Sequence, residues 1–162
     1  MITGTTRVAA VIGNPIRHSL SPALHNAAFA QLGLDWVYTA FDVSPGEAQA
    51  ALEAMRTFGL GGLSVTMPHK EAVASAVDSL DPAADALRSV NTVVPQSDGS
   101  LKGYSTDGAG FVASLAAAGV AVSGRSVCVL GAGAAARSII DALGRAGAER
   151  VAVVNRTATT AE

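Results

Sequence analysis

Short apolar runs alternate with segments of helical periodicity along the whole chain. Apolar runs of about four to eight residues predict buried strands, and apolar residues recurring every three or four positions predict helices. The expected strands cover residues 7–13, 36–43, 63–67, 90–95, 101–104, 126–131 and 150–155. The expected helices cover residues 21–32, 45–58, 68–80, 106–118 and 134–145, with a short helical turn opened by Asp81 and Pro82. This alternation predicts an α/β fold with a mainly parallel sheet.

The first helix has clear boundaries in the sequence. Ser21 is the expected cap, Pro22 occupies the first turn, where its missing N–H costs nothing, and Gly33 ends the helix. Its apolar residues predict a buried face formed by Leu24, Ala27, Ala28 and Leu32.

The order of elements predicts two domains, over residues 1–106 and 107–162. The first is an N-terminal α/β domain with a mainly parallel sheet. The second consists of a linking helix and the first βαβ unit of a doubly wound Rossmann domain, which needs further βα units to be complete. We therefore expect either that this segment depends on the first domain or that the chain is a truncation of a longer one.

Composition narrows the class of protein. With 49% hydrophobic and 15% charged residues the chain is globular rather than disordered. Eleven basic against 13 acidic residues give a net charge of −2, which argues against nucleic acid as a partner. Uncharged stretches fall short of the ~20 residues that span a membrane, and Cys128, the single cysteine, is expected to be buried and inert. We expect a cytoplasmic protein, and the spacing of the three histidines suggests no metal site.

A glycine-rich loop follows the strand at 126–131. Its residues, Gly131, Ala132, Gly133, Ala134, Ala135 and Ala136, match the G-x-G-x-x-A pattern and open the next helix. The first glycine permits a tight turn, the second lets the backbone approach a pyrophosphate, and helix N–H groups face the anion. The loop predicts dinucleotide binding. The alternative is a tight turn packed with small residues.

The next strand ends in Asn155, Arg156 and Thr157. An NAD enzyme usually has an acidic residue here for the ribose 2′-hydroxyl, whereas an arginine can pair with a 2′-phosphate. The sequence therefore favours NADP over NAD, with a solvated surface arginine as the alternative.

Polar side chains also follow two strands of the first domain. Ser19 and Ser21 come after the first strand, while Ser64, Thr66 and Lys70 close another strand and open a helix. Polar groups at the carboxyl ends of parallel strands line the usual ligand crevice. Capping and turn formation could explain the two serines without a function.

Asp107 starts a further helix, where the helix dipole alone favours an acid. Lys70, in contrast, stands in a first turn, where the dipole disfavours a cation. This placement hints at a function, although exposed lysines in first turns are ordinary.

Six motifs follow one another along the chain: H-S-L-S-P (18–22), S-V-T-M-P-H-K (64–70), S-V-N-T (89–92), S-T-D-G-A-G-F (105–111), G-A-G-A-A-A-R (131–137) and N-R-T (155–157). Together they resemble the shikimate dehydrogenase family over nearly the whole chain. The resemblance implies a substrate-binding domain, an NADP-binding Rossmann domain, and reversible reduction of 3-dehydroshikimate to shikimate in chorismate biosynthesis. Ser64 departs from the asparagine that is common at its position.

The resemblance also implies roles for individual residues. Lys70 and Asp107 match the family's catalytic pair, and Asp107 also matches one of its substrate contacts. The family's other substrate contacts correspond to Ser19, Ser21, Ser64, Thr66 and Asn91. Its cofactor-binding residues correspond to Gly131 to Ala135 and to Asn155 to Thr157.

Three alternatives remain open at this point. A quinate/shikimate dehydrogenase or an aminoshikimate dehydrogenase would carry similar motifs, although the Ser-Leu-Ser spacing resembles shikimate-selective members. A binding module that holds shikimate without turnover is the third. The expected assembly is a monomer or a homodimer.

Overall fold

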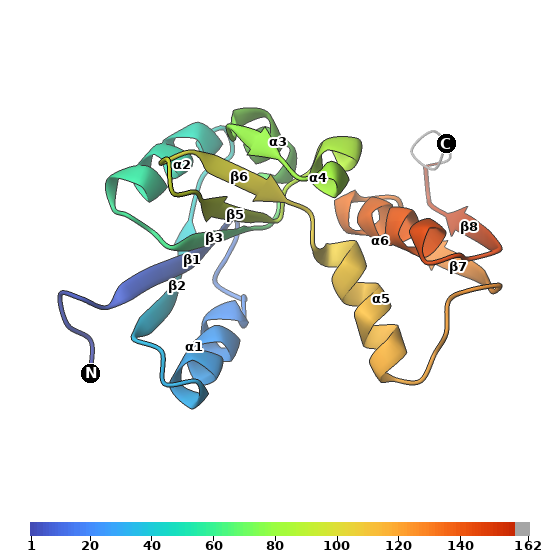
Figure 1. Cartoon of the computed structure of the whole chain (residues 1–162). Helices are drawn as coiled ribbons and strands as arrows, with labels where there is room; N and C mark the ends of the chain where they lie inside the picture. The colour runs from blue at the N-terminus through green and yellow to red at the C-terminus, as the bar shows by residue number, and fades with distance from the viewer. Residues whose placement is uncertain (158–162) are drawn as a thin grey trace. The chain divides into compact units, whose positions relative to one another are not determined.

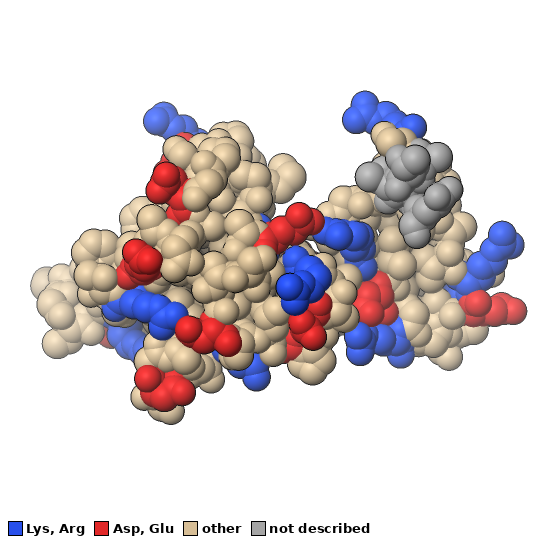
Figure 2. All heavy atoms as spheres, turned by 90° about the horizontal axis from the view of Figure 1, so that it is seen from above, with Lys and Arg blue, Asp and Glu red and all other residues tan. Residues whose placement is uncertain are grey.

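The computed structural model describes residues 1–157, which form two compact units, Met1–Tyr104 and Ser105 onward (Figure 1). Residues 158–162, which complete the second predicted domain, lie outside the described residues. Within residues 1–157 no helix is both long and apolar enough to cross a membrane. Lys and Arg side chains are interspersed with Asp and Glu on the face that Figure 2 presents.

A six-stranded mixed sheet forms the centre of the first unit, in the order β2-β1-β3-β5-β6-β4. β1 pairs in parallel with β2 and β3, and β4 pairs in parallel with β6. β5 is antiparallel to both of its neighbours, so the other strands share one direction. The fold prediction of a mainly parallel α/β sheet is therefore confirmed. The strands are β1 (Arg7–Gly13), β2 (Trp36–Asp42), β3 (Gly62–Val65), β4 (Ser79–Leu80), β5 (Thr92–Pro95) and β6 (Leu101–Tyr104).

The two faces of this sheet are covered differently. Three helices, α2 (Ala48–Thr57), α3 (Lys70–Ala76) and α4 (Pro82–Leu87), enclose the main core on one face. On the other face α1 (Ser21–Gln31) packs over β1 and β2 with a smaller core around Tyr38 (Figure 1). The remaining part of that face, over β3, β5 and β6, carries the half-buried polar side chains Ser64, Thr92 and Tyr104.

The predicted buried face of α1 is wrong. Leu24 and Leu32 are 66% and 70% exposed, and the residues that contact the sheet are His25, Asn26 and Phe29. The Asn26 amide donates to the Tyr38 carbonyl and accepts from its N–H, both at 2.8 Å, and these bonds fix which side of the helix faces the strand.

Ser21 does not cap α1 either. It is the first helical residue, and its N–H donates to Ser19 Oγ at 3.3 Å. Gly33 ends the helix with a φ of +65°, as the sequence predicts.

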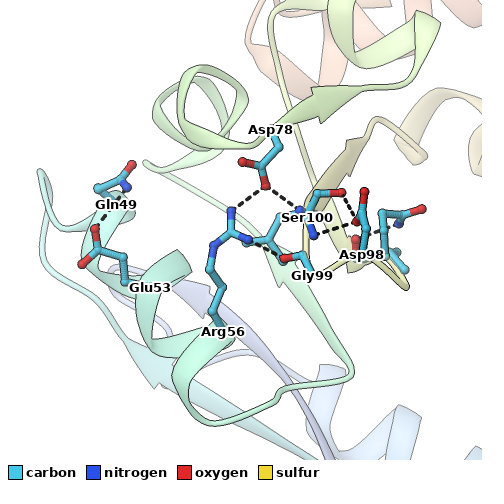
Figure 3. A network of polar contacts seen from close by, with 10 residues as sticks. Gln49, Glu53, Arg56, Asp78, Asp98, Gly99 and Ser100 are labelled. Carbon is cyan, nitrogen blue, oxygen red and sulfur yellow. Dashed lines mark hydrogen bonds and ion pairs between the residues drawn. The ribbon is translucent and has the colours of Figure 1, made fainter.

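Two other helices are shorter than expected. α2 begins at Ala48 because residues 44–47 form a turn closed by the Glu47 N–H on the Ser44 carbonyl. α3 ends at Ala76, and β4 follows because Asp78 and Asp81 pair their backbone with the strand β6. Figure 3 shows how Arg56 and Asp78 join this segment to the β5–β6 hairpin.

The second unit contains α5 (Asp107–Ala117), β7 (Ser126–Leu130), α6 (Ala134–Arg145) and β8 (Arg150–Val154). β7 and β8 pair in parallel around α6, which gives the predicted βαβ unit. α5 and α6 pack closely at Gly108, where an added Cβ would lie 2.1 Å from the Ser138 carbonyl oxygen. The expected burial of Cys128 is wrong, because this residue is exposed on the side of β7 that also presents Leu130.

Candidate functional site

The carboxyl ends of β1 and β3 lie directly beside each other. The Thr66 N–H donates to the Ile12 carbonyl, and the Asn14 N–H donates to the Met67 carbonyl, both at 2.9 Å. An added Cβ on Gly13 would lie 2.5 Å from Thr66 Cγ2. Glycine at position 13 therefore lets the Thr66 side chain lie against the end of β1. The peptide bonds before Pro15 and Pro68, in the segments that follow these strands, are cis.

Backbone hydrogen bonds bring two more of the predicted site residues to the carboxyl ends of these strands. Asn91, just before β5, accepts from the Val65 N–H at 2.8 Å. The Lys70 carbonyl accepts from the Val90 N–H at 3.0 Å. Since β5 is antiparallel to β3, its beginning coincides with the end of β3. The structure thus places Lys70 and Asn91 beside the end of the strand that carries Ser64 and Thr66.

His69 anchors the helix that begins with Lys70. Its side chain is 1% exposed, and Nε2 lies 2.8 Å from the Val43 carbonyl oxygen. A carbonyl can only accept, so Nε2 carries the proton and donates it. The sequence analysis asked only whether the spacing of His69 and the other histidines suggests a metal site, found that it does not, and missed this role. Its position between Pro68 and Lys70 at a strand-to-helix turn was the available signal.

Ser19 and Ser21 lie at the start of α1, after β1, and both are half-buried. The Ser21 carbonyl accepts from His25 Nδ1 at 2.9 Å. The His25 ring stacks on Tyr38 with centroids 4.1 Å apart and planes 10° apart. These contacts connect Ser21, through His25, to Tyr38 on the edge strand β2.

Tyr38 in turn reaches Ser64. The phenol donates to Ser64 Oγ at 2.7 Å across β1, on the face that α1 covers in part. Burial raises the pKa of the Tyr38 phenol above its ordinary value, although the bond to Ser64 opposes that shift. Tyr38 is a second residue that the sequence analysis did not identify.

Asp107 belongs to the second unit, whereas Lys70 belongs to the first. Asp107 is the first residue of α5, three positions after the end of β6. The next residue, Gly108, donates its N–H to Ser138 Oγ at 3.0 Å, so a side chain of α6 satisfies one of the open donors at the start of α5.

The glycine-rich loop occupies the turn between β7 and α6, as predicted. Gly131 has a φ of +109°, which favours glycine, and a Cβ on Gly133 would meet no atom within 4 Å. Among the described residues no side chain caps the 12-residue helix α6 at Gly133. This arrangement fits a phosphate group held by backbone donors.

The end of β8 lies beside this loop. The Gly131 N–H donates to the Val154 carbonyl at 2.8 Å, and a cavity of about 460 Å³ is lined by Leu130, Gly131, Val154, Asn155 and Arg156. Arg156 is exposed and Asn155 Nδ2 donates to the Thr157 carbonyl at 3.0 Å. An exposed guanidinium at such a cavity fits a nucleotide with an additional phosphate. Within residues 1–157 no three potential metal ligands cluster.

An α/β unit with polar side chains at the carboxyl ends of its strands, followed by a βαβ unit with a glycine-rich loop, is typical of a class of two-domain oxidoreductases. Residues 11–93 match the shikimate dehydrogenase substrate binding domain, and residues 114–162 match the shikimate / quinate 5-dehydrogenase family. The first match covers half of the chain. The chain therefore belongs to the shikimate dehydrogenase family.

Individual relatives agree with this assignment. Shikimate dehydrogenase (NADP(+)) of Rubrobacter xylanophilus is 49% identical over 156 residues, which are 96% of this chain and 55% of that protein. Shikimate 5-dehydrogenase from Listeria monocytogenes, solved in complex with shikimate and NAD, superposes with a TM-score of 0.91 at 42% identity, over 96% of this chain and 54% of that one.

The enzyme from Thermus thermophilus, solved with NADP(H) and shikimate, superposes with a TM-score of 0.88 at 40% identity, over 96% of this chain and 58% of that one. The chain thus spans about half the length of the relatives it matches.

Proposed function

We propose that this chain carries the substrate-binding part and the start of the cofactor-binding part of an NADP-dependent shikimate dehydrogenase. The proposed reaction is the reversible reduction of 3-dehydroshikimate to shikimate, a step toward chorismate and the aromatic amino acids. The observation that supports it best is the gathering of Ser64, Thr66, Lys70 and Asn91 at one sheet edge in a chain of this family.

Substrate recognition is assigned to hydroxyl and amide side chains. Ser19, Ser21, Ser64, Thr66 and Asn91 can bind the carboxylate and the hydroxyl groups of a polyhydroxylated acid. A site with fixed polar groups rejects analogues that lack the matching hydroxyl, because its own groups are then left unpaired.

Proton transfer is assigned to Lys70, with Asp107 as its partner. The Lys70 ammonium can stabilise the negative charge that develops on the C3 oxygen of the substrate and donate its proton to that oxygen. The Asp107 carboxylate would hold the ammonium in place, favour its charged form, and contact substrate.

The proposed cofactor is NADP, which supplies a hydride when bound. Gly131, Ala132, Gly133, Ala134 and Ala135 would hold its pyrophosphate through backbone N–H groups. Arg156, with Asn155 and Thr157, would bind the 2′-phosphate end. The support is the start of α6, which no described side chain caps, and the cavity at the ends of β7 and β8.

The proposed compartment is the cytoplasm, and the proposed assembly is a monomer or a homodimer. A single cysteine offers no internal disulfide of the kind that oxidising compartments favour. Analytical ultracentrifugation of the chain tests the assembly.

Two measurements on the 162-residue chain test the function. The first is absorbance of the reduced nicotinamide with shikimate and NADP, repeated with quinate in place of shikimate. The second is calorimetry with shikimate alone and with NADP. Turnover with shikimate supports the proposal, and a clear quinate preference would replace it with a quinate dehydrogenase. Shikimate binding without NADP binding or turnover would favour a binding module.

Lys70→Ala tests the proposed catalytic residue. Loss of a positioned acid–base group should lower turnover by about two to four powers of ten, while the fold is kept. Lys102→Ala is the matched control, because Lys102 is the other lysine of the chain and contacts the Tyr104 ring. Retained turnover in Lys70→Ala would remove Lys70 from the mechanism.

A further inference from the structure

The hydroxyl of Ser64 has a defined hydrogen-bonding direction. Tyr38 donates its proton to Ser64 Oγ at 2.7 Å, which occupies one acceptor position of that oxygen. A serine hydroxyl has a single proton of its own to donate. Ser64 is half-buried rather than enclosed, so its own proton can be donated to a bound molecule. The hydroxyl lies on the sheet face that it shares with Thr92 and Tyr104.

Neighbouring residues fix the position of Tyr38 beside Ser64. His25 stacks flat against its ring, and the Asn26 amide pairs with both of its backbone polar groups. A phenol is already protonated at neutral pH at its ordinary pKa of 10.0, and burial raises the pKa of Tyr38 further. With the phenol donating to Ser64 Oγ, the serine proton is left for another partner.

The location of this donor connects it to the proposed site. Ser64 lies opposite Thr92 in the sheet and two residues before Thr66, next to the edge where Asn91 and Lys70 gather. Successive contacts run from Ser21 through His25 and Tyr38 to Ser64. They connect the proposed substrate contacts at the start of α1 with those at the end of β3.

We propose that Tyr38 is a positioning residue that makes Ser64 an obligate hydrogen-bond donor to an acceptor oxygen of the bound hydroxy acid. The inference rests on the proposed function, because it assigns the bound acid to this sheet face. Tyr38 itself does not touch the ligand. It acts through Ser64. Because Tyr38 donates to Ser64 Oγ, Ser64 donates its own proton to the ligand.

A double-mutant cycle in shikimate affinity tests the inference. Calorimetry of the 162-residue chain is compared for the wild type, Tyr38→Phe, Ser64→Ala and the double variant. Tyr38→Phe keeps the ring and its stacking on His25 but removes the donor. We expect the Kd for shikimate to rise about three- to tenfold in each single variant, the usual effect of one hydrogen bond. In the Ser64→Ala background the Tyr38 substitution should have no further effect.

Thr39→Val is the control, because it removes a hydroxyl from the next residue of β2 on the opposite face of the sheet. Its Kd should equal that of the wild type. In the turnover assay, Tyr38→Phe should raise KM for shikimate while kcat stays within about twofold, since the bond affects binding rather than proton transfer.

Two results overturn the inference. An unchanged Kd in Tyr38→Phe would show that Ser64 needs no positioning, and an equal loss in the Ser64→Ala background would show that Tyr38 acts by another route. In both cases wild-type binding remains and the proposed function stands. A wild-type chain that binds no shikimate would overturn the proposed function together with the inference.

Discussion

At the residue scale, His69 links the proposed catalytic lysine to a distant part of the chain. Its ring is buried and donates to the Val43 carbonyl, which lies at the end of β2. Removing the ring in His69→Ala creates a cavity and leaves that carbonyl without its donor. We expect a loss of about 2–4 kcal/mol in the free energy of unfolding, measured by urea denaturation.

His18→Ala provides the comparison, because His18 is exposed. It should change the free energy of unfolding by less than about 0.5 kcal/mol. Equal stabilities of the two variants would contradict the anchoring role of His69.

The sequence pointed to the proposed site residues but not to the residues that hold them. Ser64, Thr66 and Lys70 are recognisable because a strand, a turn and a helix start follow one another in one short segment. Tyr38 and His69 each contact a residue 26 positions away, and no local pattern encodes such a contact. Their roles became visible only with the register of β1, β2 and β3.

At the element scale, one ion pair ties α2 and β4 to the β5–β6 hairpin. Arg56 donates to Asp78 at 2.5 Å and to the Gly99 carbonyl at 2.6 Å, while the Leu101 N–H donates to Asp78 (Figure 3). The Leu101 N–H, followed by Arg56, holds the pKa of Asp78 below its ordinary value of 3.8.

This lowered pKa sets the sign of a pH dependence. A depressed carboxyl pKa contributes stability that is complete above the unfolded-state value and is lost as the pH falls through the folded-state value. The wild type should therefore be more stable than Asp78→Asn at neutral pH, and the difference should shrink below pH 3.8.

Urea denaturation at a series of pH values measures this difference. Asp85→Asn is the control, because Asp85 forms an exposed pair with Arg88 at 3.3 Å and should contribute little. A difference between wild type and Asp78→Asn that stays constant down to acidic pH would refute the linkage.

Substitutions at two glycines of α5 test the effects of close packing and of helix propensity independently. A Cβ at Gly108 would lie 2.1 Å from the Ser138 carbonyl oxygen, whereas a Cβ at Gly110 would meet nothing within 4 Å. Gly108→Ala should lower the free energy of unfolding of the second unit by about 1–3 kcal/mol, because α5 must move away from α6. Gly110→Ala should raise it by up to about 1 kcal/mol. Thermal denaturation followed by circular dichroism distinguishes the two outcomes, and a stable Gly108→Ala would refute the close contact.

The elements themselves were largely predictable from periodicity, and the errors have identifiable causes. The strand 7–13, the hairpin around Gly99 and the helix 134–145 appear as expected. The face of α1 was assigned wrongly because an asparagine and a histidine, rather than leucines, pack on the edge strand. The end of α3 was missed because β4 exists through pairing with β6, which follows some twenty residues later.

At the scale of the whole molecule, the two proposed ligands draw most of their contacts from different units. The proposed substrate contacts from Ser19 to Asn91 lie in residues 1–104, whereas Asp107, the remaining proposed contact, belongs to the second unit with the glycine-rich loop and Arg156. A ligand that binds only the native state suppresses opening of the structure it contacts, and at a hundred times its Kd the stabilisation is about 2.7 kcal/mol. Each ligand should therefore protect chiefly the unit that supplies most of its contacts.

Hydrogen exchange measured by mass spectrometry tests this separation in the 162-residue chain. Shikimate should slow exchange in peptides that contain residues 64–70 and 90–93. Adenosine 2′,5′-bisphosphate should slow exchange in peptides that contain residues 131–137, and adenosine 5′-monophosphate should do so more weakly, because it lacks the phosphate assigned to Arg156. Arg156→Ala should remove the difference between the two nucleotides without changing the effect of shikimate. Equal protection by both nucleotides in the wild type would mean that Arg156 does not select the 2′-phosphate, and the preference for NADP would then have to come from other residues.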